Sequence, residues 1–140
     1  MKLLITFLAI ILLPFHKITW ETNVENALQN IKNTDKTVLL YFSGSDWCKP
    51  CIQLKTDVFE TALFADYANE KLELVNIDFK RDQSDTSKTI ITYNESIAER
   101  YNPKGYFPFV VVLDSSGTIL KQIDGFKGET ADYYIKHYLQ

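Results

Sequence analysis

The sequence is short of the residues that build metal sites and disulfide scaffolds. Its 140 residues include only two cysteines and two histidines. Two cysteines are too few for a disulfide-rich scaffold, for a four-thiolate zinc site or for a four-thiolate iron–sulfur site. The histidines, His16 and His137, have no metal-ligand spacing to the cysteines. We therefore expect no metal in this protein.

An excess of positive charge is also missing. Fifteen lysines and arginines stand against 18 aspartates and glutamates, for a formal net charge of −3. Because a protein that neutralises phosphates needs a basic surface, nucleic acid is not an expected partner. There is also no phosphate-binding loop, no nucleotide fingerprint and no catalytic Ser/His/Asp set. What is present is a hydrophobic share of 46%, enough for the core of one domain.

The longest apolar run lies at the N-terminus. Lys2 precedes a run from Leu3 to Leu13 in which Thr6 is the one polar residue. A bilayer-spanning helix needs about 20 apolar residues, so this shorter run is typical of a signal peptide. We predict a signal peptide over residues 1–16 and a mature, exported, periplasmic domain over residues 17–140. An uncleaved membrane anchor or a buried helix is the alternative, because no A-x-A cleavage pattern follows the run.

The remaining sequence alternates between strand and helix patterns. Strands are predicted at residues 38–42, 72–78, 109–113 and 119–123. Helices are predicted at residues 23–33, 48–58, 61–68 and 87–101, and from Thr130 onward. The fourth helix places Ile90, Ile97 and Tyr101 on one stripe, and the polar segment before it, residues 80–88, is an expected exposed loop. This order predicts one α/β domain of three layers, with a central mixed β-sheet flanked by helices.

The motif that carries chemistry is WCKPC, from Trp47 to Cys51, between a buried strand and a helix. A helix N-terminus presents free N–H groups and a partial positive charge, which favour a thiolate and lower the pKa of Cys48. Lys49 adds a positive charge, and Pro50 suits a first helical turn. We predict that Cys48 is an exposed nucleophile and that Cys51, one turn further on, is the resolving thiol behind it.

Two other interpretations of the cysteine pair stay open at this point, a static disulfide and half of a metal site. Closing a four-residue loop stabilises a protein by only about 2 kcal/mol in the chain-entropy treatment. A structural cross-link is therefore a weak reason for this spacing, and redox chemistry is the favoured interpretation.

A second motif, GYFP from Gly105 to Pro108, directly precedes the strand at residues 109–113. Cis bonds make up about 5–6% of X–Pro bonds in folded proteins. Taken alone, Pro108 therefore predicts a trans proline in a turn.

The strand–WCKPC–helix order, followed by a proline that enters a β-hairpin, resembles the thioredoxin superfamily over residues 18–140. The SGSDWCxxC loop is similar to that of small exported bacterial thioredoxin-like proteins. The resemblance implies a thioredoxin-like fold, a Cys48–Cys51 redox disulfide and a cis bond before Pro108. It also implies that Phe107 offers its backbone to the substrate and that Trp47 flanks the nucleophile. The implied substrate-binding residues are Trp47, Lys49, Pro50, Phe107 and Pro108.

The activity that this resemblance implies is that of a thiol:disulfide oxidoreductase, which reduces or isomerises protein disulfides outside the cytoplasm. A disulfide-forming oxidant and a binding module without turnover are the alternatives. No dissociable cofactor is needed, because the two thiols carry the electrons. The resemblance points to a membrane thiol:disulfide transporter as a candidate electron donor, and we expect a monomer.

Two positions depart from the cytosolic thioredoxins. Those proteins carry a buried Asp on the strand that leads into the active site and a Lys near it on the next strand. The corresponding residues here are Tyr41 and Leu74. A buried general base for Cys51 is therefore not expected, and a charge at Tyr41 would be costly in an apolar site.

Overall fold

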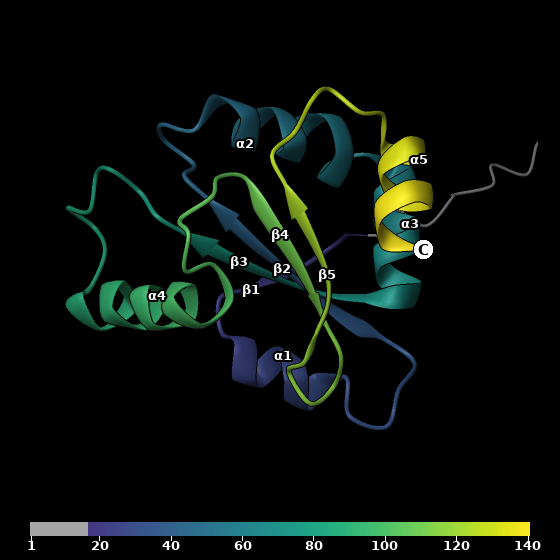
Figure 1. Ribbon diagram of the computed structural model, residues 1–140, viewed down its shortest axis with the longest axis horizontal. Helices are drawn as coiled ribbons and strands as arrows, with labels where there is room; N and C mark the ends of the chain where they lie inside the picture. The colour runs from purple at the N-terminus through teal and green to yellow at the C-terminus, as the bar shows by residue number, and fades with distance from the viewer. Residues whose placement is uncertain (1–16) are drawn as a thin grey trace, which may run out of the picture.

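The computed structural model describes residues 17–140, so the predicted signal peptide lies outside the described residues. A five-stranded sheet with the order β1-β3-β2-β4-β5 forms the centre of the domain (Figure 1). The strands are β1 (Trp20–Glu21), β2 (Thr37–Ser43), β3 (Leu72–Asp78), β4 (Phe109–Leu113) and β5 (Ile119–Asp124). β1, β3 and β2 run parallel, whereas β4 is antiparallel to β2 and to β5. The predicted mixed sheet is confirmed, and β1 is a short strand that was not predicted.

Helices cover both faces of the sheet. They are α1 (Val24–Asn30), α2 (Lys49–Leu54), α3 (Ala62–Lys71), α4 (Lys88–Tyr101) and α5 (Ala131–Tyr134). Two of them continue as π-helical turns, α2 into η1 (Lys55–Phe59) and α5 into η2 (Ile135–Leu139). Four of the helices begin at N-caps of the preferred residue types, because each cap side chain accepts a backbone N–H three residues on; the caps are Asn23, Thr61, Ser87 and Thr130.

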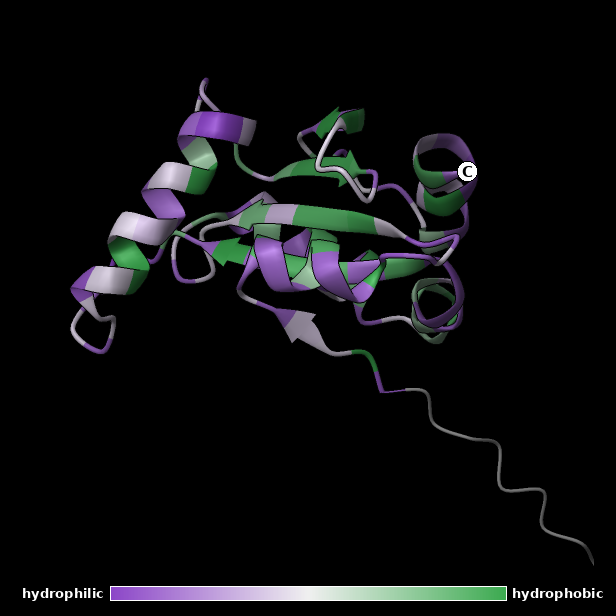
Figure 2. Ribbon diagram, turned by 90° about the horizontal axis from the view of Figure 1, so that it is seen from below, coloured by the Kyte–Doolittle hydropathy of each residue, from purple (hydrophilic) through white to green (hydrophobic). Residues whose placement is uncertain are grey.

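The sheet separates two apolar cores. One core lies between the sheet and the helices α2, α3 and α5, and the other lies between the sheet and α1 and α4. Along β2 the side chains alternate between them, since Leu39 and Tyr41 enter the first core and Leu40 and Phe42 the second. Figure 2 shows the hydrophobic central strands between helices that alternate hydrophobic and hydrophilic residues. The expectation of strands buried on both faces is confirmed for β2 and β4.

One predicted core position is wrong. The sequence places Ile90, Ile97 and Tyr101 on one stripe of α4, which we take for its core-facing side, but Ile90 is 51% exposed, whereas Ile97 and Tyr101 are buried. The reason is visible in Figure 1, where the first turns of α4 extend beyond the edge of the sheet. At the next position of the stripe the helix buries Asn94, whose side-chain amide donates to the carbonyl oxygen of Asp78 at 3.1 Å.

Candidate active site

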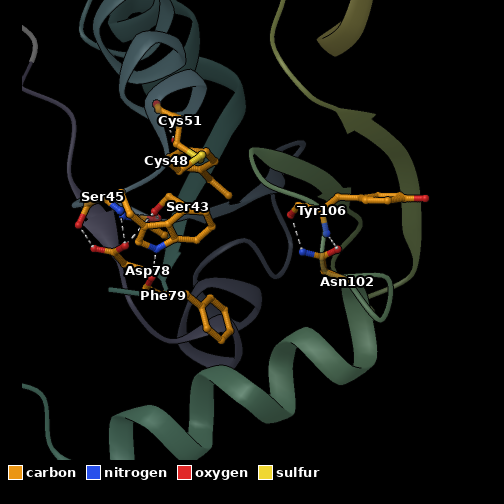
Figure 3. Close-up of a disulfide and its surroundings, with 11 residues drawn as sticks. Ser43, Ser45, Cys48, Cys51, Asp78, Phe79, Asn102 and Tyr106 are labelled. Atoms are coloured by element: carbon orange, nitrogen blue, oxygen red, sulfur yellow. Dashed lines mark hydrogen bonds between the residues drawn. A yellow bond between two sulfur atoms is a disulfide. The ribbon is translucent and has the colours of Figure 1, made fainter. Parts of the chain in front are cut away.

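The two cysteines form a disulfide at the start of α2, directly after the loop that follows β2 (Figure 3). Cys48 is the N-cap residue of the helix, and Pro50 occupies its first turn, as predicted. The S–S bond is 2.04 Å long. The N–H groups of Trp47 and Cys48 both donate to the carbonyl oxygen of Gly44, at 3.2 and 2.8 Å. The loop therefore closes on itself and presents the cysteine pair at one end of the sheet.

The burial of Cys48 differs from the sequence prediction, whereas Cys51 lies behind it as predicted. Cys48 was expected to be exposed, but in the disulfide form it is 4% exposed and Cys51 is 1% exposed. Both sulfur-bearing side chains belong to the apolar core under α2. In the disulfide form Cys48 is therefore part of this core, which a sequence pattern does not reveal. Lys49 is exposed and Pro50 half-buried, so α2 opens to solvent on that side.

Aromatic rings connect the active-site loop, which runs from Gly44 to Cys48, to the proline loop, which runs from Gly105 to Pro108. Trp47, 38% exposed, lies edge-on to Phe107 with ring centroids 5.4 Å apart, and Phe107 lies 5.6 Å from Phe79. The indole N–H of Trp47 donates to the carbonyl oxygen of Phe79 at 2.6 Å. The peptide bond between Phe107 and Pro108 is cis, as the resemblance implied. The fold thus brings residues 47 and 107 together, although 60 positions separate them in the sequence.

Gly44 is a site residue that the sequence reasoning missed. A Cβ atom at this position would collide with the indole ring of Trp47. Since that ring is held by its hydrogen bond to Phe79, it has little freedom to move aside. The loop therefore requires glycine where Trp47 folds back over the chain.

Two further residues that the sequence reasoning missed, Asp46 and Asp78, join the active-site loop to β3 and to the segment after it. Asp78, at the end of β3, accepts the backbone N–H of Ser45 at 2.9 Å and the hydroxyl of the same residue (Figure 3). Asp46 accepts the backbone N–H groups of Arg81 and Asp82, each at 2.9 Å. These two hydrogen bonds lower the pKa of Asp46, and the bond from the N–H of Asp82 has the larger effect. The polar segment after β3 is exposed, as expected, but its start is bound to the active-site loop.

Asn102 holds the backbone of the proline loop in place with its side chain. Its buried side-chain amide donates to the carbonyl oxygen of Tyr106 at 2.9 Å and accepts the N–H of Tyr106 at 2.9 Å (Figure 3). The pair of bonds closes the turn that leads from α4 into Phe107. An Asn directly after a predicted helix was the available sequence signal, because Asn commonly bonds backbone groups at such ends.

Tyr41 is buried beneath α2, as predicted. It is 3% exposed, and its phenol donates a hydrogen bond to the carbonyl oxygen of Cys51 at 2.8 Å. Burial, and then the negative charge of Asp78, raise the pKa of Tyr41. Leu74 is buried in the same core, two residues before Asn76, the β3 residue that pairs with Tyr41. Among residues 17–140 the buried polar side chains are Ser43, Asn94 and Asn102, so no carboxylate joins Tyr41 there.

Between residues 17 and 140, no group of three or more His, Cys, Asp or Glu side chains gathers in a way that could hold a metal ion. Within the same range, no helix combines the length and the apolar character that crossing a membrane requires.

Residues 19–115 match the model of a family described as thioredoxin-like. The chain belongs to this family. It is 31% identical over 119 residues to disulfide bond reductase DsbH of Chlamydia pneumoniae, covering 84% of this chain and 69% of that protein. A solved structure described as DsbH oxidoreductase superimposes with a TM-score of 0.76 at 28% identity, over 85% of this chain and 80% of that one.

A second solved structure, a disulphide isomerase from Xylella fastidiosa, has a TM-score of 0.54 and 25% identity, over 71% of this chain and 69% of its own. These comparisons confirm the thioredoxin-like fold expected from the sequence. Together with the Cys48–Cys51 disulfide, they identify a thioredoxin-like thiol:disulfide oxidoreductase with a CxxC redox pair.

Proposed function

We propose that this protein reduces or isomerises disulfides of proteins outside the cytoplasm, with Cys48 as the attacking thiolate and Cys51 as the resolving thiol. The observation that carries the proposal is the disulfide at the start of α2, with Trp47 of its loop packed against Phe107 of the proline loop. The sulfur pair thus lies next to the cis-proline loop, whose backbone we propose as the docking point for a substrate strand.

The reaction balances within the protein and its substrate. In the reduced protein, the Cys48 thiolate attacks one sulfur of a substrate disulfide, and the other substrate sulfur leaves as a thiolate. Cys51 then gives up its proton and attacks the sulfur of Cys48, which releases the second substrate thiolate. The protein ends as the disulfide seen in the structure, and two electrons have moved to the substrate. The two thiols carry those electrons, so the cycle as written needs no dissociable cofactor.

The substrate-binding surface that we propose surrounds Cys48 at the N-terminal end of α2. Trp47 and Phe107 form an aromatic pair beside Cys48, and we propose that the backbone of Phe107 bonds to an extended peptide. Lys49 is exposed and Pro50 half-buried at the same helix end, whereas Pro108 is buried and supports the loop from within. We assign Trp47, Lys49, Pro50 and Phe107 to substrate contact, and we assign Pro108 to holding the loop that presents Phe107.

The reductive direction is supported by the names of the relatives, a disulfide bond reductase and a disulphide isomerase. A reductase outside the cytoplasm needs a supply of electrons, and a membrane thiol:disulfide transporter is our proposed donor. The N-terminal apolar run supports export to the periplasm, or membrane attachment there if the run is not cleaved. We propose that the domain works as a monomer.

The experiment that tests the direction is equilibration with glutathione. A potential near that of thioredoxin, about −270 mV, is expected, whereas a value near about −120 mV would identify a disulfide-forming oxidant. Reduction of a disulfide-bonded substrate protein, with the Cys48→Ser variant as control, separates an enzyme from a binding module. A wild-type protein that binds the substrate without reducing it would show that the proposal is wrong.

A further inference from the structure

We propose that Tyr41 is a positioning residue for the second half of the exchange reaction. Its phenol holds Cys51 in place for attack on the mixed disulfide. This inference rests on the proposed function and adds to it a residue that neither the CxxC motif nor the proline loop contains. It starts from the hydrogen bond of 2.8 Å between the Tyr41 hydroxyl and the Cys51 carbonyl oxygen.

The hydrogen bond from Tyr41 matters because the covalent restraint on Cys51 is temporary. In the disulfide form, the S–S bond keeps the two cysteines together. While Cys48 is bonded to a substrate sulfur, that restraint is gone, and the position of the Cys51 thiol depends on how this turn of α2 is held against the sheet. The N–H of Lys55 also donates to the Cys51 carbonyl, but it belongs to the same continuous helical segment. The Tyr41 bond instead reaches from β2 and fixes this turn relative to the sheet.

Tyr41 is itself firmly placed. β2 is the central strand of the sheet, paired with β3 on one side and β4 on the other. The phenol ring lies edge-on to Phe59 with centroids 5.1 Å apart, and 5.9 Å from the ring of Trp20. Because aromatic contacts of this kind restrict ring movement, the hydroxyl is presented to α2 from a rigid base.

The phenol acts as a neutral donor. Its pKa is raised by burial and by the negative charge of Asp78, so the hydroxyl keeps its proton throughout the working pH range. A protonated phenol already donating to a carbonyl is not a base for the Cys51 thiol. The contribution of Tyr41 is therefore to position Cys51, and the proton of Cys51 leaves by another route.

The test follows the two half-reactions separately. Reduced protein is mixed with glutathione disulfide and quenched with acid at successive times, and the glutathione adduct on Cys48 is counted by mass spectrometry. Tyr41→Phe keeps the ring and removes the donor. Tyr101→Phe is the matched control, because the buried Tyr101 donates to the Gly117 carbonyl at 3.2 Å from the other core.

For Tyr41→Phe we expect an adduct that forms at the wild-type rate and lives about five to ten times longer, the effect of one neutral hydrogen bond. Tyr101→Phe should resolve like wild type, even though it loses a comparable bond. A Tyr41→Phe adduct with the wild-type lifetime would overturn the inference, and so would equal lengthening in both variants. If Tyr41→Phe does not fold, Tyr41→Met, which fills similar space without a donor, is held to the same outcomes. Failure of the proposed function is recognised separately, as a wild-type protein that stays reduced and forms neither the adduct nor the Cys48–Cys51 disulfide.

Discussion

At the residue scale, Cys48 and Cys51 are both buried, but they differ in their place in the helix and in their hydrogen-bond partners. Cys48 is the N-cap of α2, where its own N–H bonds to Gly44 and the helix N-terminus begins. Cys51 lies inside the helix, with its carbonyl oxygen bound by the phenol of Tyr41. This difference in position suits one cysteine to meet a substrate and the other to act from behind it.

We predict that Cys48→Ser abolishes disulfide exchange and that Cys51→Ser leaves long-lived mixed disulfides with substrate proteins. The reason is the order of the two cysteines at the helix start. Gel analysis of trapped complexes under non-reducing conditions, with the double serine variant as control, measures this outcome. Trapping that proceeds equally well through Cys51 would show that the two roles are assigned wrongly.

The pKa of Cys48 in the reduced protein should lie below the free-thiol value of about 8.5. The helix N-terminus and the exposed Lys49 both favour the thiolate. The alkylation rate should therefore rise with pH and level off once the pH exceeds this lowered pKa. The Cys51→Ser variant isolates the Cys48 signal, which thiolate absorbance can follow as well. A midpoint above the free-thiol value would contradict activation by the helix.

Replacing Tyr41 with Asp should destabilise the protein without creating thioredoxin-like behaviour. The variant loses a buried ring, and large-to-small aromatic changes in cores cost about 3–5 kcal/mol. An Asp there must ionise in an apolar site or remain protonated with a raised pKa. Leu74, buried in the same core, offers no compensating charge. Chemical unfolding and the pH profile of exchange test this, and unchanged stability with faster exchange near neutral pH would show that these surroundings are misjudged.

At the scale of elements, the site is a junction of three loops with separate anchors. The loop after β2 bonds to Asp78, the segment after β3 bonds to Asp46, and the loop after α4 is closed by Asn102. Each anchor is one side chain that bonds to backbone groups. Asp78 and Asp46 bond to segments distant in the sequence, whereas Asn102 bonds within its own turn. The cysteine pair is therefore positioned by polar side chains in or next to these loops as well as by the apolar core.

We expect Asp46→Ala to release the start of the segment after β3. Amide hydrogen exchange at Arg81 and Asp82 should become at least several-fold faster, because both N–H groups lose a charged acceptor. The exposed Asp57, in η1, provides the control variant Asp57→Ala. Exchange at residues 81 and 82 that stays slow in the Asp46 variant would contradict this account of the loop.

The same anchor should respond to pH in the wild-type protein. Folding lowers the pKa of Asp46 from its ordinary value of 3.8, so the anchor is complete at pH values well above 3.8. It is lost as the pH falls through the lower, folded-state pKa. Exchange at Arg81 and Asp82, corrected for the intrinsic pH effect, should therefore increase only under acid conditions.

At the scale of the whole molecule, the domain over residues 17–140 buries both faces of its sheet. One core faces α2, α3 and α5, and the other faces α1 and α4. β5 forms one edge of the sheet and leaves Ile119 and Leu120 largely exposed.

A chain that begins at Lys17 should consequently fold, remain monodisperse and reduce disulfides. Size-exclusion chromatography with light scattering and a disulfide reduction assay check the three properties, with the full chain as comparison. If the shortened chain aggregated while a membrane-bound full chain was active, the N-terminal segment would be an anchor that the domain needs.

The sequence by itself determined the elements and the chemistry of this protein. Apolar runs placed β3 at Leu72–Asp78 and β4 at Phe109–Leu113 to the residue, and the WCKPC motif located the redox pair. These features are local, since they depend on side-chain periodicity and on the spacing of two cysteines within one helical turn.

Only the tertiary structure decided how these parts meet. It added β1, buried Cys48, exposed Ile90 and joined Tyr41 to the Cys51 carbonyl. It also bound Asp46 to a segment 35 residues further along the chain. The physical reason is that such contacts depend on where the sheet brings distant residues together, and neither periodicity nor motif spacing records that distance.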